Sequence, residues 1–131
     1  MKNSLHILIV DDDEGMTETL KDILEYVGYH VETAEDGYTA LEKVGQHSYD
    51  AAFVDFRMPG IDGLETVRRI KQADSSIHLF MITAFPVENL EQNALKEGAQ
   101  EVLYKPLEIK SILDLIKNLE AASEQDRSQD E

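Results

Sequence analysis

Five apolar stretches alternate with five amphipathic ones along this chain. Dense aliphatic or strictly alternating runs predict strands over residues 5–10, 29–34, 51–55, 77–83 and 101–104. Apolar residues that recur at every third or fourth position predict helices over residues 16–27, 38–45, 64–73, 87–97 and 109–119. Short segments rich in Gly, Pro and Asp separate these elements, so the pattern predicts one strand–helix unit repeated five times.

This order of elements predicts an α/β fold. The strands are too far apart in the sequence for hairpins, so we expect them to pair in parallel through right-handed helical crossovers. The expected architecture is (βα)5: a doubly wound, five-stranded parallel sheet with helices on both faces. Such sheets bind ligands at the carboxyl ends of their strands, so the residues that follow each strand are the first candidates for chemistry.

Four of the five predicted strands end at polar or charged side chains, which are Asp11–Asp13, Asp55, Thr83 and Lys105. Clustered carboxylates raise one another's proton affinity unless a cation neutralises them, and a cluster of oxygens suits Mg²⁺. An aspartate next to such a cation can attack phosphorus, so the set predicts a phosphoryl-acceptor site. Each residue taken alone has a plainer interpretation, as part of a solvated turn, a helix cap or a strand end.

Four motifs at these positions carry a resemblance to a known family. They are "LIVDDD" (8–13), "FVDFRMPGIDG" (53–63), "MITA" (81–84) and "YKPL" (104–107). In this order and spacing the chain resembles the response-regulator receiver domain, the CheY-like partner of bacterial histidine kinases, over residues 5–119. The resemblance implies a flavodoxin-like, CheY-like fold.

The resemblance also implies roles for the acidic residues. Asp55 matches the phosphoacceptor, and Asp11 and Asp12 match the acidic pair that holds Mg²⁺ with it. Asp12 is then the direct ligand, and Asp11 acts largely through water. Arg57 stands where the family offers a backbone carbonyl to the metal, so its side chain is not a ligand. Asp13 is an acid beyond the family's pair, and the resemblance gives it no role.

Two further residues match the family's catalytic set, and one departs from its pattern. Thr83 matches the switch hydroxyl, and Lys105 matches the lysine that pairs with the acceptor or its phosphate. The Lys105–Pro106 peptide bond matches one that is typically cis in this family. The family's switch aromatic, three positions before the lysine, is replaced by Val102. Because valine has no ring to rotate, we expect activation to work through Thr83 and the loop around Phe85.

The function implied by the resemblance is a phosphorylation-dependent signalling switch. A histidine kinase or a histidine phosphotransfer protein would donate the phosphoryl group to Asp55 in the presence of Mg²⁺. The surface formed by the fourth helix, the fifth strand and the fifth helix would then change and regulate a partner or a linked output domain. Dimerisation on phosphorylation and a cytoplasmic location are further expectations. Such a domain catalyses its own phosphorylation and dephosphorylation only to a limited extent. It is therefore not expected to be an enzyme.

Two other functions remain open at this stage. A metal-dependent phosphatase also uses an aspartate nucleophile on an α/β sheet, but it usually needs a second aspartate two residues later, where this chain has Arg57. The length also leaves no room for the cap domain of such enzymes. A nucleotide-binding module would need a GxGxxG or GKS/GKT sequence after a strand, and the chain contains neither.

Composition excludes several classes of partner. The 131 residues carry a formal net charge of −15, which argues against direct binding to nucleic acid or to an anionic membrane. No apolar run is long enough to span a bilayer, and the absence of cysteine fits a reducing compartment. Residues 1–119 form the expected domain, whereas residues 120–131 are acidic, lack apolar periodicity and are expected to be a disordered tail or linker.

The four histidines show no metal-ligand spacing. They are His6, His30, His47 and His78, which lie far apart in the sequence. We interpret them as structural or surface residues rather than zinc ligands. None resembles a phosphoryl-donor histidine, so the donor should be a separate protein or domain.

Overall fold

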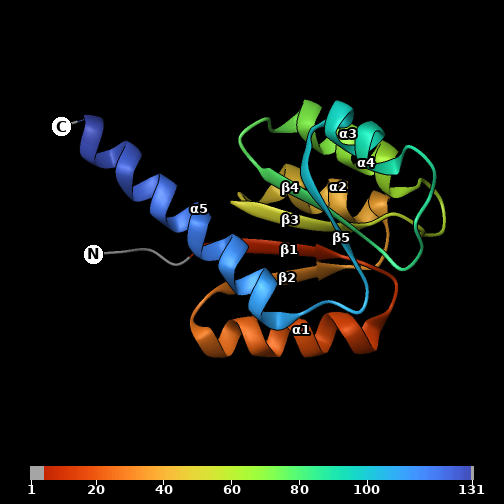
Figure 1. The fold of residues 1–131 in the computed structure, drawn as a ribbon, viewed down its shortest axis with the longest axis horizontal. Coiled ribbons are helices and arrows are strands. Elements are labelled where there is room, and N and C mark those ends of the chain that lie inside the picture. The colour runs from red at the N-terminus through yellow and green to blue at the C-terminus, as the bar shows by residue number, and fades with distance from the viewer. Residues whose placement is uncertain (1–4, 131) are drawn as a thin grey trace.

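A five-stranded parallel sheet lies at the centre of the computed structural model, which describes residues 5–130 and their side chains as far as residue 122 (Figure 1). The strands are β1 (His6–Val10), β2 (His30–Ala34), β3 (Ala51–Asp55), β4 (His78–Thr83) and β5 (Ala99–Tyr104). Their order in the sheet is β2-β1-β3-β4-β5. The predicted (βα)5 doubly wound fold is confirmed.

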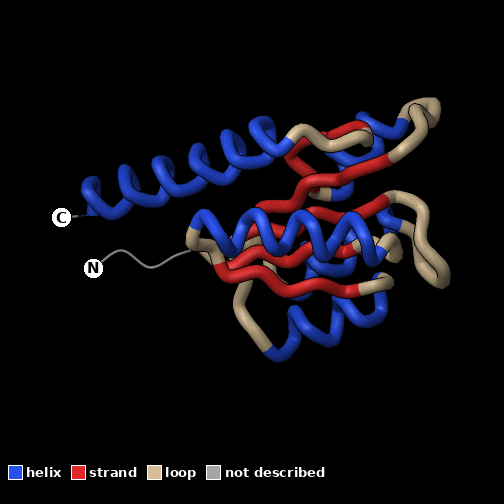
Figure 2. The backbone as a smooth tube through the Cα atoms, turned by 90° about the horizontal axis from the view of Figure 1, so that it is seen from below, coloured by secondary structure: helices blue, strands red, loops and turns tan. Residues whose placement is uncertain are grey.

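Helices cover both faces of this sheet (Figure 2). They are α1 (Glu14–Val27), α2 (Gly37–Gln46), α3 (Gly63–Ala73), α4 (Leu90–Glu97) and α5 (Ile109–Asp130). The buried side chains of α1 and α5 pack with Ile7 and Ile9 of β1, whereas those of α2, α3 and α4 pack with Leu8 and Val10. Neighbouring residues of β1 therefore enter opposite cores, which is why this strand is aliphatic on both faces.

Aspartates cap the first three helices. The side chains of Asp13, Asp36 and Asp62 accept hydrogen bonds from backbone N–H groups in the first turns of α1, α2 and α3, at 3.1, 2.8 and 2.9 Å. A carboxylate at this position satisfies a free N–H group and complements the positive end of the helix dipole. Three of the 27 acidic residues of the chain thus begin helices.

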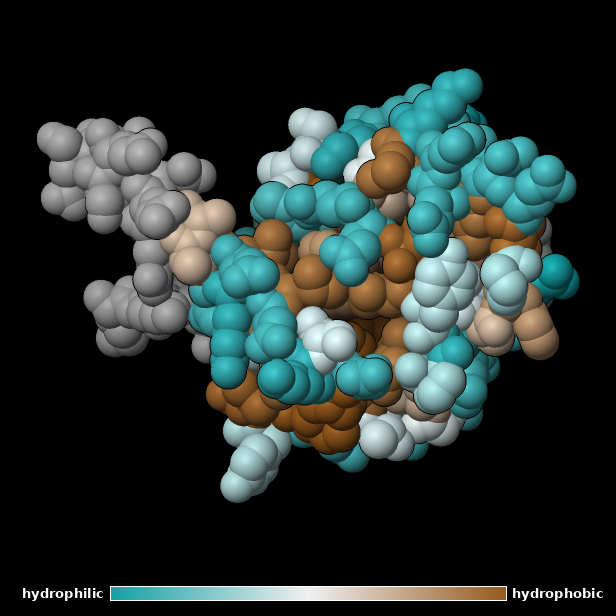
Figure 3. Space-filling view, viewed as in Figure 1, coloured by the Kyte–Doolittle hydropathy of each residue, from teal (hydrophilic) through white to brown (hydrophobic). Residues whose placement is uncertain are grey.

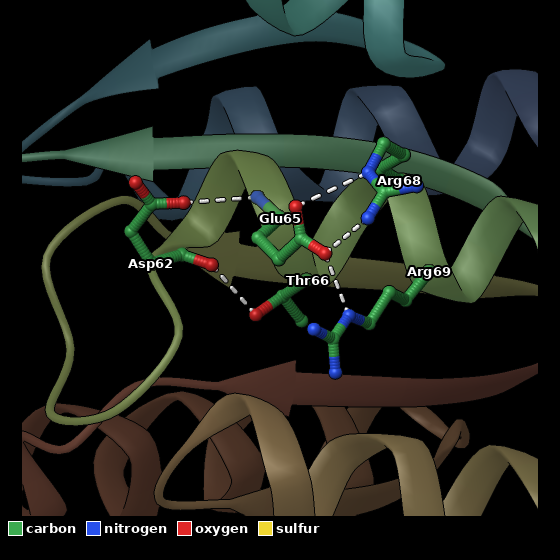
Figure 4. A network of polar contacts seen from close by, with 5 residues as sticks. All are labelled: Asp62, Glu65, Thr66, Arg68 and Arg69. Carbon is green, nitrogen blue, oxygen red and sulfur yellow. Dashed lines mark hydrogen bonds and ion pairs between the residues drawn. The ribbon is translucent and has the colours of Figure 1, made fainter.

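A network of polar contacts extends from the cap of α3 along the helix (Figure 4). The Glu65 carboxylate accepts hydrogen bonds from Nε of Arg68 at 3.1 Å and from Nε of Arg69 at 2.6 Å. The bonds from Arg68 and then Arg69 lower the pKa of Glu65 to about 2. The two arginines of α3 are therefore paired within their own helix.

Helix α4 begins three residues later than the sequence predicts. Residues 87–89 form a turn in which the N–H of Leu90 donates to the carbonyl of Val87 at 3.0 Å, and Asn89 has the left-handed φ of 64°. Asn89 makes no side-chain capping bond to the helix. The sequence prediction began the helix at Val87 because this apolar side chain packs against the core, although it does so from the turn before the helix.

Helix α5 continues beyond residue 119, where its apolar stripe ends. Its helical backbone reaches Asp130, and the Tyr29 hydroxyl donates to Glu120 at 2.7 Å. Residues 120–130 are rich in Ala, Glu and Gln, which favour helix without requiring a buried face.

Residues 1–4 of the expected domain and residue 131 of the expected tail lie outside the described residues. The division between domain and tail at residue 119 stays a prediction. Within residues 5–130, no helix combines the length and the apolar character needed to cross a bilayer.

Gly63 at the start of α3 provides a test of how tightly the loop after β3 is packed. A Cβ at this position would lie 2.4 Å from the backbone oxygen of Asp55 and 2.7 Å from Cα of Phe56. We expect Gly63→Ala to lower the free energy of unfolding by about 2 kcal/mol or more, because backbone atoms must shift.

The matched control is Gly45→Ala on α2, where a Cβ meets nothing within 4 Å. This change should raise the free energy of unfolding by up to about 1 kcal/mol, because alanine favours helix. Urea unfolding monitored by circular dichroism measures both values. Equal stability of the two variants would contradict the tight packing at Gly63.

Candidate phosphoryl-acceptor site

Three carboxylates meet at the carboxyl edge of the sheet. Asp55 ends β3, Asp11 and Asp12 follow β1, and the pairing of Val10 with Val54 places the two strand ends side by side. Each of the three aspartates offers an oxygen within 4.8 Å of the others. Asp11 and Asp55 are buried, at 2% and 5% exposure, whereas Asp12 is open to solvent. The predicted convergence of these residues is therefore present in the fold.

Lys105 reaches this cluster from the end of β5. Its Nζ lies 2.8 Å from Oδ2 of Asp11 and 3.6 Å from Oδ1 of Asp55. The Lys105–Pro106 peptide bond is cis, as predicted, and the N–H of Lys105 donates to the carbonyl of Thr83 at 2.8 Å. Burial opposes the charged ammonium, but contact with Asp11 and the charges of Asp11 and Asp55 outweigh it and raise the pKa of Lys105.

One ammonium does not neutralise the three carboxylates. Burial first, and then repulsion from Asp11, raises the pKa of Asp55 to about 6, although Lys105 acts in the opposite direction. Asp55 therefore carries its charge at neutral pH at a cost to the folded state. A second cation at this point would stabilise the ionised carboxylate.

Asp13 has a structural place in this loop. Its side chain caps α1 through the N–H of Met16, while its own N–H donates to Oδ1 of Asp11 at 3.0 Å. It therefore both starts the helix and orients a carboxylate of the cluster. The sequence left its role undetermined, although an aspartate just before a helical pattern is a capping signal.

Thr83, Phe85 and Arg57 lie in the two loops that follow β4 and β3. Thr83 is 1% exposed, and its hydroxyl donates to the carbonyl of Phe85 at 3.0 Å and accepts from the N–H of Phe85 at 3.3 Å. The guanidinium of Arg57 lies 5.9 Å from the centre of the exposed Phe85 ring, within the range of a cation–π contact. The two loops are thus linked above the edge of the sheet.

A pocket opens between these loops, next to the cluster. Its lining includes Asp12, Arg57, Met58, Pro59 and Val87. The apolar spacing places Val87 in a helix, whereas this residue lines the pocket from the turn before α4. Sequence spacing gave no signal for this pocket, because its lining comes from the loops after β1, β3 and β4.

The family model that describes the response regulator receiver domain matches residues 7–117. The chain belongs to this family. It is 34% identical to the response regulator MprA of Mycobacterium ulcerans (strain Agy99) over 116 residues, which cover 88% of this chain and 50% of MprA. It is 40% identical to the transcriptional regulatory protein ZraR of Klebsiella oxytoca over 102 residues, 78% of this chain and 23% of ZraR. The receiver domain thus spans half or less of the length of these relatives.

Solved receiver structures share its fold. A CheY-like receiver domain protein from Methanospirillum hungatei JF-1 superposes with a TM-score of 0.88 at 27% identity, covering 94% of this chain and 99% of that one. The response regulator TrrA of Thermotoga maritima, solved in complex with Mg(2+)-BeF, superposes with a TM-score of 0.78 at 31% identity, covering 88% and 98%. The flavodoxin-like, CheY-like expectation is confirmed, and the chain is a receiver domain of two-component signalling.

The donor set of the receiver domain fits a magnesium ion. Three carboxylates supply hard oxygen ligands. Burial first, and then repulsion from Asp11, raises the pKa of Asp55, so a bound cation would stabilise its ionised form. Lys105 supplies a single ammonium that lies closer to Asp11 than to Asp55. Both the excess of negative charge and the oxygen ligands of the cluster therefore suit a divalent cation.

Asp55→Asn tests the electrostatic cost of the cluster. Without divalent cations at pH 7.5, we expect the variant to be more stable than the wild type by about 2 kcal/mol, because it removes an ionised buried carboxylate. The folded-state pKa of Asp55, about 6, lies above the ordinary value, so ionisation opposes folding. The wild type should therefore gain stability relative to the variant as the pH falls through 6 toward 4.

Urea unfolding in EDTA across this pH range measures the difference. The control is Asp12→Asn, which removes an exposed carboxylate and should stabilise the domain by less. A wild type more stable than Asp55→Asn at pH 7.5 in EDTA would contradict this account of the site.

Proposed function

We propose that this receiver domain is a phosphorylation-dependent switch in which Asp55 accepts a phosphoryl group in the presence of Mg²⁺. The observation that supports it best is the cluster of Asp11, Asp12 and Asp55 with Lys105 at its side. These groups supply a nucleophile, cation ligands and a fixed positive charge at one edge of the sheet.

Asp12 and Asp55 would hold the magnesium ion together with the backbone carbonyl of Arg57, and Asp11 would act largely through water. The ion, when bound, neutralises the carboxylates and the charge that develops on the transferred group. The exposure of Asp12 leaves this residue accessible to an ion from solvent, while the N–H of Asp13 fixes the orientation of Asp11.

Asp55 is the nucleophile of the proposed reaction. A carboxylate oxygen of Asp55 forms a bond to phosphorus as the P–N bond of a donor phosphohistidine breaks, and the electron pair of that bond stays on the imidazole nitrogen. Lys105, 3.6 Å from Asp55, would move from Asp11 toward the new phosphoryl oxygens, whose charge exceeds that of a carboxylate. Because Asp55 must be ionised to attack, transfer should slow as the pH falls. Bound Mg²⁺ stabilises the ionised carboxylate, so this loss should occur below the metal-free pKa of about 6.

Thr83 would carry the signal out of the site. Its hydroxyl has one proton, which it donates to the carbonyl of Phe85. Donation of this proton to a phosphoryl oxygen would break that bond and free the loop that carries Phe85. The phosphoryl group would also compete with the Phe85 ring for the guanidinium of Arg57.

The surface that changes would be the one formed by α4, β5 and α5. Figure 3 faces this side, and its apolar centre is bordered by hydrophilic residues. Tyr104 is the register partner of Thr83, and its hydroxyl donates to Glu91 in the first turn of α4 at 2.7 Å. Val102, at the position of the family's switch aromatic, is half-buried against the α4 side of the core. A change at Thr83 can therefore reach α4 through Tyr104.

A histidine kinase or a histidine phosphotransfer protein is the proposed donor. The relatives that carry further domains are named as a response regulator and a transcriptional regulatory protein, so a linked output domain or a separate partner is the proposed target. The formal charge of −15 disfavours direct binding of nucleic acid or an anionic membrane. We place the domain in the cytoplasm, with dimerisation on phosphorylation, and assign it a regulatory role rather than that of an enzyme with turnover.

Acetyl phosphate distinguishes this proposal from a phosphatase. With Mg²⁺ we expect one phosphate per chain, stable in acid and labile in base, as shown by intact-protein mass spectrometry. Asp55→Asn should abolish the adduct, and EDTA should prevent its formation. Asp13→Asn is the control. It should still form the adduct, because asparagine caps a helix as well as aspartate does. Rapid multiple turnover, or an adduct on Asp55→Asn, would refute the proposal.

Beryllofluoride, a mimic of the phosphoryl group, tests the path of the signal. We expect amide chemical shifts to change most over residues 83–89, because Thr83 releases Phe85, and less over α4 and β5. Tyr104→Phe, which lacks the hydroxyl that binds Glu91, should keep the loop changes and reduce those on α4. Large changes at Val102 with a silent loop would contradict this path.

A further inference from the structure

The opposite, amino edge of the sheet brings two histidines together. His6 is the first residue of β1, His30 is the first residue of β2, and the two are register partners in the parallel pair. Their rings are stacked, with centroids 4.7 Å apart and planes at 26°. Both side chains are exposed. Because the two residues lie on different strand–helix units, the sequence spacing that argued against metal ligands says nothing about this pair.

Backbone hydrogen bonds hold the pair in place from both sides. The N–H of His6 donates to Oδ2 of Asp50 at 2.8 Å, and the N–H of Asp50 donates to the carbonyl of His6 at 2.8 Å. The N–H of His30 donates to the carbonyl of Leu5 at 3.0 Å. The two Cα atoms are therefore fixed by the sheet, and only the exposed rings are free to turn. Such an arrangement lowers the entropic cost of binding one ligand with two side chains.

The exposed pair lies on the face of the sheet opposite to α5. Side chains alternate along a strand, so His6 shares its face with Leu8 and Val10, the side of α2, α3 and α4. The contact between Tyr29 and α5 lies with the other core, on the opposite face. The helix α5 therefore does not lie on the face that carries the two imidazoles.

We propose that His6 and His30 form a two-imidazole site for a divalent transition metal ion such as Cu²⁺. Imidazole nitrogen suits copper and zinc, whereas Mg²⁺ prefers the oxygen cluster at the other edge of the sheet. Binding requires the rings to turn out of their stack so that one nitrogen of each faces the ion, and exposed side chains change rotamer on a fast time scale. The negative net charge of the chain favours capture of a cation, and water completes the coordination.

Titration of the full chain with Cu²⁺ in the presence of excess Mg²⁺ tests the site. We expect one tightly bound Cu²⁺ per chain by isothermal titration calorimetry, with an electron paramagnetic resonance spectrum that shows two nitrogen ligands. His6→Asn and His30→Asn should each weaken binding by about 10²-fold, because the second ligand then no longer acts within the same molecule. Both variants should still be phosphorylated by acetyl phosphate, which keeps this test separate from that of the switch.

His78→Asn is the matched control. His78 is the exposed first residue of β4, but its side chain points to the other face and its Nδ1 lies 2.7 Å from Oε1 of Gln100. Copper affinity should be unchanged in this variant. Oxygen-only ligation in the spectrum, an unchanged affinity of His6→Asn or His30→Asn, or an equal loss in His78→Asn would each overturn the proposal. Unchanged circular dichroism of the variants would show that any loss is not caused by unfolding.

Discussion

Repulsion among three carboxylates held at one edge of the sheet is the constraint on which the site depends. Asp11 and Asp55 are buried next to each other, and Lys105 compensates only part of their charge. Burial first, and then repulsion from Asp11, raises the pKa of Asp55. A site with this excess of negative charge favours a cation and responds strongly when a charged group is added to it. The property that destabilises the metal-free domain is thus the one that would make the proposed switch sensitive.

The rest of the fold keeps these charges from moving apart. β1 and β3 are buried on both faces, so the strands that end in Asp11 and Asp55 cannot splay without exposing both cores. Gly63 lets the start of α3 approach the backbone of Asp55 more closely than any other residue would allow. The loops above the edge are held less firmly: Phe85 is exposed, and α4 begins without a side-chain cap. The rigid strands therefore position the charges, and the looser loops are free to respond.

The two edges of the sheet differ in the chemistry that they present. The carboxyl edge gathers oxygen ligands from β1 and β3, and the amino edge stacks two imidazoles from β1 and β2. Both groupings arise because parallel pairing brings the equivalent ends of strands together, whatever their separation in the sequence. Hard and borderline cations would accordingly be sorted to opposite ends of the same strands. β1 contributes to both sites, which lie on either side of its four buried residues.

The sequence by itself determined the five strands, their parallel pairing and the convergence of Asp11, Asp12, Asp55 and Lys105. These follow from local periodicity and from the rule that strand ends share an edge. The order of the strands in the sheet came from the structure. The capping of α1 by Asp13 had a signal in the sequence, an aspartate just before a helical pattern. Apolar spacing could not show that α4 begins only after Asn89 or that helical backbone continues to Asp130, since these depend on local geometry that it does not encode. The bond between Tyr104 and Glu91 and the stack of His6 on His30 were decided by the tertiary structure alone. Each joins residues from different strand–helix units, and only the packed sheet sets the distance between them.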